Sequence, residues 1–243
     1  MEYESKWYNF FKKALSNNSQ LQFANKISLS LTDTDNMPYS EIVDINSIDY
    51  AYTDNKGINN AALVIFLDNR THCFKLLLAN TYGYISLYFP LTREKFKMLV
   101  INKVLFEDFK GKIDNDFINN VSNIDSELVK KEILNSYWKK LTNEDKLNYE
   151  VIQPETVKIN DNLLNNDINK FEAQEEIFHS ANFSVVFLFP VEVDYTIYPM
   201  PQVVANNRKP NFESIYKPRK TQKRYMFKLD WEEITWKFSE LNP

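Results

Sequence analysis

The residues best suited to nucleophilic or acid–base chemistry are few. Cys73 is the only cysteine, and His72 and His179 are the only histidines. A Ser-His-Asp hydrolase would need one of these histidines together with a nucleophile turn of the GxSxG type, and the sequence has no such turn. Cys73 follows His72 directly, but adjacent side chains in a strand point to opposite faces. We therefore expect Cys73 to be a small hydrophobe beside a surface histidine, and we assign no catalytic residue.

Glycine and cysteine usage excludes several kinds of site. Only Gly57, Gly83 and Gly111 occur in 243 residues, and no window matches the glycine patterns of Walker or Rossmann loops. Those loops need glycine because their backbone must approach a phosphate closely. A single cysteine also excludes a cysteine-rich zinc site and an intrachain disulfide, so we predict no bound metal.

The charge balance gives no reason to expect nucleic acid or a membrane as a partner. Lys and Arg number 29 against 33 Asp and Glu, for a net charge of -4. One stretch is locally basic and contains aromatic residues that could stack on bases; we interpret it as a solvated loop, with a phosphate- or nucleic-acid-contacting loop as the alternative. Its basic residues are Arg208, Lys209, Lys217, Arg219, Lys220, Lys223 and Arg224, and its aromatic residues are Phe212, Tyr216 and Tyr225.

The chain shows no sign of insertion into a membrane or of export. No apolar run approaches the roughly 20 residues needed to cross a bilayer. The first residues lack the basic and apolar regions of a signal peptide. We predict a protein of the cytoplasm or the nucleus.

Hydrophobic periodicity predicts strands at both ends of the chain with helices between them. Residues 4–17 have helical spacing, residues 23–49 alternate as a hairpin, and 70–80 could form a short helix. Residues 111–150 are helical in period, and Thr142 followed by Asp145 is typical of a helix start. The remaining strands are predicted at 61–67, 82–89, 95–106, 183–189 and 191–195, and the final hairpin at 225–229 and 234–238.

These elements predict one α+β domain over residues 1–243, built as an antiparallel barrel with helical additions. Two segments interrupt the pattern. Residues 155–178 are rich in Asn, Asp and Glu with few apolar anchors, and residues 199–220 contain four prolines. We predict a flexible insertion at each.

Five sequence blocks, in a shared order and spacing, resemble motifs of the pyridoxamine 5'-phosphate oxidase-like family. The block from Leu87 to Phe96 reads LYFPLTREKF, close to the family's WYFPxTREQF. The other blocks are FLDNRT at 66–71, WKKLT at 138–142, FPVEVD at 189–194 and the ending that starts at Trp236. The resemblance implies a six-stranded antiparallel split β-barrel with peripheral helices and an N-terminal helix.

The resemblance also implies a cofactor and an assembly. Members of this family hold FMN at the interface of a homodimer, with the flavin phosphate bound by basic and hydroxyl side chains. Arg70 and Thr71 match the family's Arg-Ser pair, and Lys95 takes the place of the glutamine in its TREQ motif. Trp236 would lie near the flavin ring. The candidate cofactor residues are therefore Arg70, Thr71, Lys95 and Trp236.

Three other positions depart from the family pattern. The two arginines of a family strand fall on Glu41 and Asn46, and a family lysine falls on Cys73. A carboxylate in place of a phosphate-facing arginine repels the ligand. The resemblance thus implies a flavin-dependent oxidoreductase type of protein with an eroded FMN site, and we do not expect it to oxidise pyridoxamine 5'-phosphate. The alternative is a cofactor-free dimeric scaffold that binds another protein through its insertions at 107–135 and 155–178.

Overall fold

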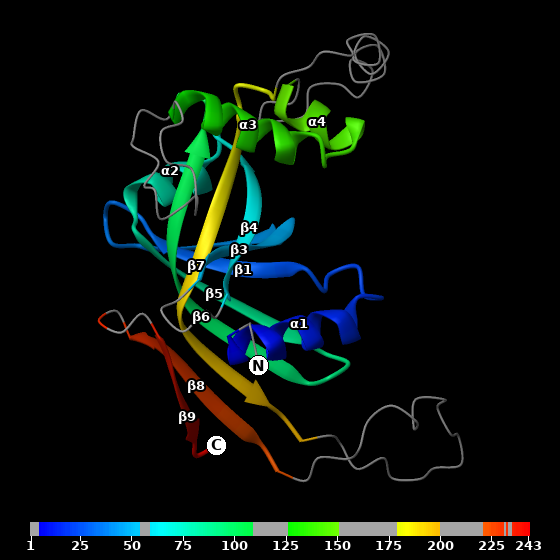
Figure 1. Cartoon of the computed structure of the whole chain (residues 1–243), viewed down its shortest axis with the longest axis vertical. Helices are drawn as coiled ribbons and strands as arrows, with labels where there is room; N and C mark the ends of the chain where they lie inside the picture. The colour runs from blue at the N-terminus through cyan, green and yellow to red at the C-terminus, as the bar shows by residue number, and fades with distance from the viewer. Residues whose placement is uncertain are drawn as a thin grey trace.

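A single antiparallel sheet joins the nine strands in the part of the chain that the structure describes (Figure 1). The computed structural model describes residues 5–53, 59–108, 126–150, 179–199, 221–230, 232 and 235–243. The strand order is β2-β1-β5-β6-β7-β4-β3, with β8 beside β7 and β9 beside β8. The strands are β1 (Lys26–Thr32), β2 (Pro38–Asp44), β3 (Ser47–Thr53), β4 (Asn59–Asp68), β5 (Tyr82–Phe89), β6 (Glu94–Phe106), β7 (Phe183–Ile197), β8 (Lys223–Asp230) and β9 (Thr235–Leu241).

The longest strand, β7, connects the two halves of this sheet. One of its edges pairs with β6 along the whole length, while the other edge pairs first with β4 and then with β8. The sequence suggested a break at Pro190, but the strand continues through it. Pro190 lies opposite Val100, where the register of β6 shifts after Leu99. Such a bulge tolerates proline because its missing N–H does not interrupt a regular ladder.

Helix α1 (Lys6–Asn18) packs on the inner face of the sheet. Its apolar stripe carries Trp7, Phe11 and Ala14, none of which is exposed. The ring of Phe11 lies 5.9 Å from Phe89 and 5.3 Å from Phe96, centroid to centroid, in edge-to-face contact. The amphipathic pattern of the N-terminal segment therefore correctly predicts a helix that covers the core.

Helices α3 (Ser126–Trp138) and α4 (Asn143–Glu150) form a second layer near one end of the molecule (Figure 1). Strand β4 shows how they divide the packing: Leu63 and Ile65 face the main core, whereas Val64 and Phe66 face the helical layer with Trp138. The first half of β7 is buried on both faces for the same reason, which explains its nearly continuous apolar sequence.

The helix start predicted at Thr142 and the short helix predicted at 70–80 both occur in the structure. The predicted helix start is confirmed: the Thr142 hydroxyl accepts from the Asp145 N–H at 3.1 Å and donates to the Asp145 carboxylate at 2.7 Å. The short helix at 70–80 is confirmed as α2 (His72–Ala79). The insertions predicted at 155–178 and 199–220 lie outside the described residues, apart from Pro199.

The α+β class, the antiparallel sheet and the N-terminal helix are confirmed, but the described sheet has nine strands where the family resemblance implies six. Hydrophobic periodicity does not predict β3, in which Ser47 and Asp49 alternate with apolar residues. Asp49 accepts a hydrogen bond from the Tyr137 hydroxyl of α3, so a distant helix satisfies this polar strand residue. Among the described residues, no helix is long and apolar enough to cross a bilayer.

Candidate functional site

The turn from β4 into α2 holds the first two candidate residues. Strand β4 ends at Asp68, whose carboxylate accepts from the Arg70 N–H at 2.8 Å. Asn69 ties the turn to the residues before β7, because its side-chain amide donates to the Ala181 carbonyl at 2.7 Å. These contacts close a tight turn and fix the backbone positions of Arg70 and Thr71.

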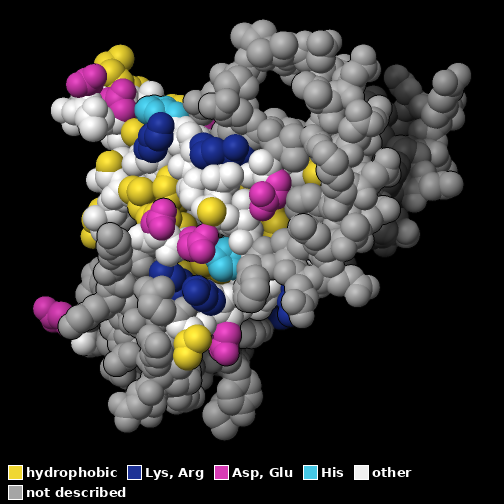
Figure 2. All heavy atoms as spheres, turned by 90° about the horizontal axis from the view of Figure 1, so that it is seen from above, with side chains coloured by type: hydrophobic (Ala, Val, Ile, Leu, Met, Phe, Trp, Pro, Cys, Tyr) yellow, Lys and Arg dark blue, Asp and Glu magenta, His cyan; other side chains and the backbone are white. Residues whose placement is uncertain are grey.

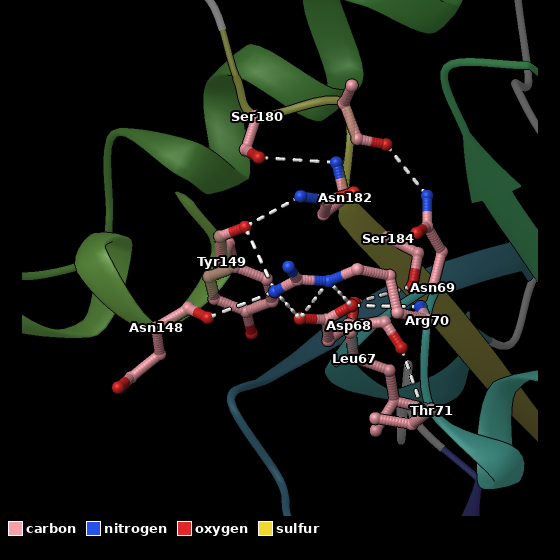
Figure 3. A network of polar contacts seen from close by, with 11 residues as sticks. Leu67, Asp68, Asn69, Arg70, Thr71, Asn148, Tyr149, Ser180, Asn182 and Ser184 are labelled. Atoms are coloured by element: carbon pink, nitrogen blue, oxygen red, sulfur yellow. Dashed lines mark hydrogen bonds and ion pairs between the residues drawn. The ribbon is translucent and has the colours of Figure 1, made fainter. Parts of the chain in front are cut away.

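The Arg70 guanidinium lies between the Asp68 carboxylate and the Asn148–Tyr149 end of α4 (Figure 3). Its Nε lies 2.9 Å from Asp68 Oδ1 and its Nη2 lies 2.5 Å from Asp68 Oδ2. The same Nη2 donates to the carbonyls of Asn148 and Tyr149, at 3.4 and 3.2 Å, at the C-terminal end of α4. A cation is favoured there because the last carbonyls of a helix carry partial negative charge. Arg70 thus caps α4 and joins the helical layer to the turn.

The electrostatics of this pair follow from its burial. The Arg70 and Asp68 side chains are 27% and 12% exposed. The hydrogen bond that the guanidinium donates to Asp68 raises the pKa of Arg70, and partial burial opposes that effect. The two charges neutralise each other, so the turn offers little net positive charge to an anion.

Thr71 is the N-cap of α2. Its hydroxyl donates to the Asp68 carbonyl at 2.7 Å and accepts from the Phe74 N–H at 3.3 Å. The hydroxyl proton is therefore directed to the chain's own backbone.

The three positions that depart from the family pattern also make internal contacts. The Glu41 carboxylate accepts from the Tyr39 hydroxyl at 2.6 Å and lies beside the Cys73 thiol. The Asn46 side chain accepts from the Phe66 N–H at 2.7 Å, which ties the start of β3 to β4. A carboxylate, an amide and a thiol stand where the resemblance implies three basic side chains.

Cys73 is completely buried, as the sequence suggested, whereas His72 is exposed. Burial, and after it the Glu41 carboxylate, raises the pKa of the thiol to about 12. Because the thiolate is the reacting form, we expect the native thiol to react with Ellman's reagent at least about a hundredfold more slowly than the unfolded chain. Equal rates in native buffer and in denaturant would contradict this placement.

Lys95 and Trp236 lie elsewhere. Lys95 is near the start of β6, in register with Tyr88 and with Thr196. Arg70 follows Asp68, which pairs with Phe183 at the opposite end of β7. The path along β7 from Phe183 to Thr196 is roughly 40 Å at about 3.3 Å per residue. Lys95 and Arg70 are therefore not neighbours in one protomer.

Trp236 packs against the N-terminal helix. Its ring centroid is 5.8 Å from that of Trp7, and the ring is partly buried on the main core. Of the basic cluster, Arg224 pairs with Asp194 at 2.8 Å, and Tyr225 stacks on Tyr195 with centroids 5.9 Å apart. Its members from Arg208 to Lys220 lie outside the described residues.

The surface at the end with α2, α3 and α4 mixes both signs of charge. Figure 2 shows basic and acidic side chains interspersed with apolar ones across its described part. Within the described residues, no group of three or more His, Cys, Asp or Glu side chains is placed to hold a metal ion.

The comparisons with known proteins identify the fold. No family model and no curated protein sequence matches the chain. Among solved structures, a pyridoxamine 5'-phosphate oxidase-related, FMN-binding protein from Nostoc punctiforme PCC 73102 aligns with a TM-score of 0.68 at 18% identity, over 98% of both chains. The chain has the pyridoxamine 5'-phosphate oxidase-like split-barrel fold. PhzG from Burkholderia lata 383, in complex with tetrahydrophenazine-1-carboxylic acid, aligns with a TM-score of 0.64 at 12% identity, over 98% of this chain and 93% of PhzG.

The resemblance noted in the sequence is thus confirmed for the fold, and the fit of FMN to this split barrel is a separate question. At the β4–α2 turn, the residues present do not suit a phosphate. Arg70 is paired with Asp68, the Thr71 hydroxyl caps α2, and Glu41 adds a negative charge beside its first turn. The contacts of Arg70 and Thr71 depend on α4 and on backbone carbonyls, which sequence motifs do not reveal.

Proposed function

We propose that this chain is a split-barrel protein of the FMN-binding type that binds FMN weakly and does not oxidise pyridoxamine 5'-phosphate. In this proposal, the residues at the flavin phosphate site hold α4 against the β4–α2 turn and no longer bind a phosphate. The observation that carries this proposal is the placement of Arg70 between Asp68 and the end of α4. An arginine in that position stabilises the helical layer and has its charge balanced within the chain.

The expected loss of affinity follows from the replaced side chains. A charge-assisted hydrogen bond is worth about 1.5 to 3 kcal/mol. The changes at Glu41, Asn46 and Cys73 together remove on the order of 5 to 9 kcal/mol if all three partners faced the phosphate. Since each 1.4 kcal/mol is about tenfold in affinity, nanomolar binding would become micromolar or weaker.

The flavin content of the purified protein tests this proposal. We expect a colourless preparation that quenches FMN fluorescence only at micromolar protein or above. A yellow protein with one FMN per chain would overturn the proposal. It would restore the enzyme hypothesis, in which FMN supplies the redox chemistry and Arg70, Thr71, Lys95 and Trp236 surround it.

A second candidate function is a cofactor-free dimeric scaffold that binds another protein. The α3–α4 layer favours it, because Arg70 and Asn182 both anchor the Tyr149 carbonyl and so fix that layer on the barrel. In this proposal the chain forms a homodimer and uses its insertions for the partner. Complete absence of FMN binding at high micromolar concentration, with an intact dimer, would favour the scaffold.

A further inference from the structure

A buried histidine lies between the helical layer and the start of β7, apart from the residues considered for FMN. His179 is 7% exposed. The Asn135 side-chain oxygen, on α3, accepts from the His179 backbone N–H at 3.0 Å and lies 2.7 Å from its ring Nδ1. One asparagine therefore holds both the backbone and the ring of this residue.

This arrangement fixes which nitrogen of the His179 ring carries the proton. Because the Asn135 oxygen can only accept, Nδ1 carries the proton and Nε2 keeps its lone pair. Within the described part of the chain, the buried Nε2 atom has no hydrogen-bond partner. A second proton on the ring would place a buried charged donor at this position, where no acceptor among the described residues satisfies it.

Within the described ranges, the charged groups around the ring come from α3 and from the residue after β6. On α3, Lys130 is 3% exposed and donates to the Glu107 carbonyl at 2.7 Å, and Lys131 follows it. Among the described residues, the Glu107 side chain, just after β6, is the nearby charge that favours the protonated ring. Burial lowers the pKa of His179 from its ordinary 6.5; Glu107 opposes this, and Lys131 and Lys130 add to it.

We propose that the contact between His179 and Asn135 is an acid-sensitive latch that holds α3 against the start of β7. At neutral pH the neutral ring fits the site. Protonation puts a second buried cation near Lys130 and leaves its new N–H unsatisfied, so the layer of α3 and α4 loosens from the sheet.

The direction of the pH effect follows from linkage. A lowered pKa in the folded state means that the unfolded chain takes up the proton first. His179 contributes its full stabilisation above pH 6.5, the ordinary pKa of histidine. This contribution is lost as the pH falls from 6.5 through the lowered pKa of His179 in the folded state. Because Trp138 of α3 packs on Phe183 of β7, with ring centroids 5.1 Å apart, loosening exposes an aromatic surface.

Hydrogen exchange read by mass spectrometry tests the latch. Peptides from α3 and from β5 are compared at about pH 8 and about pH 5, after correction for the intrinsic exchange rate. We expect protection of α3 to fall at least about tenfold in the acid while β5 stays protected. His179→Asn keeps a donor toward Asn135 but cannot take up a proton, so its α3 protection should not change with pH. His72→Asn alters the other, exposed histidine and should behave as wild type.

A second variant keeps the proposal testable if His179→Asn fails to fold. Asn135→Asp places a carboxylate beside the ring and favours the protonated state, so acid should no longer loosen α3. Equal α3 protection at both pH values in wild type would overturn the proposal. The same acid loss in His179→Asn as in wild type would also overturn it.

Discussion

Replacing Arg70 by alanine is expected to lower the free energy of unfolding by about 3 kcal/mol. The change removes two contacts to the carbonyls of α4 and leaves the Asp68 carboxylate, 12% exposed, without its counter-ion. Removing one partner of a largely buried pair costs more than the pair itself contributes, because the remaining charge stays desolvated. Urea denaturation followed by circular dichroism measures the difference.

Two further variants show whether the loss arises from this pair. Adding Asp68→Asn to Arg70→Ala removes the Asp68 charge that has lost its counter-ion. The double variant should therefore lose less free energy of unfolding than the two single variants together. Lys26→Ala breaks an ion pair with Asp44 in which both side chains are 44% exposed, and it should cost less than about 1 kcal/mol. If Arg70→Ala and Lys26→Ala lower the free energy of unfolding by equal, small amounts, Arg70 does not hold α4 against the β4–α2 turn.

Replacing Tyr84 by glutamate is expected to convert the proposed homodimer into a monomer. Tyr82, Tyr84 and Tyr88 lie on the outer face of β5 and are 54%, 42% and 47% exposed. Ile42 on β2, two strands from β5, is 63% exposed and shares this face, because it pairs with Ser28, which pairs with Ser86. Exposed tyrosine and isoleucine side chains on one face of a sheet are typical of an interface between subunits.

Light scattering coupled to size-exclusion chromatography measures this change. In a two-fold interface each substitution occurs twice, so one glutamate introduces two buried charges. Leu128→Glu on α3 is the matched control, since Leu128 is 58% exposed but lies outside this face. A monomeric wild-type protein would contradict the proposed assembly, and a Tyr84→Glu dimer would place the interface elsewhere.

Much of the fold is predictable from the sequence because its periodicity matches its burial. Strand β5 alternates from Tyr82 to Phe89 between exposed and buried residues, and its bounds agree with the prediction. The helix start at Thr142 was predictable because the capping contacts are local. Strand β3 was not predictable, since the hydroxyl that hydrogen-bonds to Asp49 belongs to Tyr137 of α3, 88 residues away.

The candidate site was less predictable for a related reason. A motif match places Arg70 and Thr71 at the β4–α2 turn, and the structure has them there. The motif does not reveal that the guanidinium caps α4, because the accepting carbonyls of Asn148 and Tyr149 are 78 and 79 residues further along the chain. The charge change at Glu41 was visible in the sequence, but its contact with Cys73 required the fold.

The loss of phosphate recognition is tested most directly by comparing the affinities of FMN and riboflavin for the wild-type protein by isothermal titration calorimetry. The two ligands share the flavin ring and differ in the phosphate, so their ratio isolates that group. A turn in which Arg70 is paired with Asp68 and Glu41 adds a negative charge predicts dissociation constants within about tenfold of each other. Binding of FMN about a thousandfold tighter than riboflavin would show a working phosphate site and contradict the account.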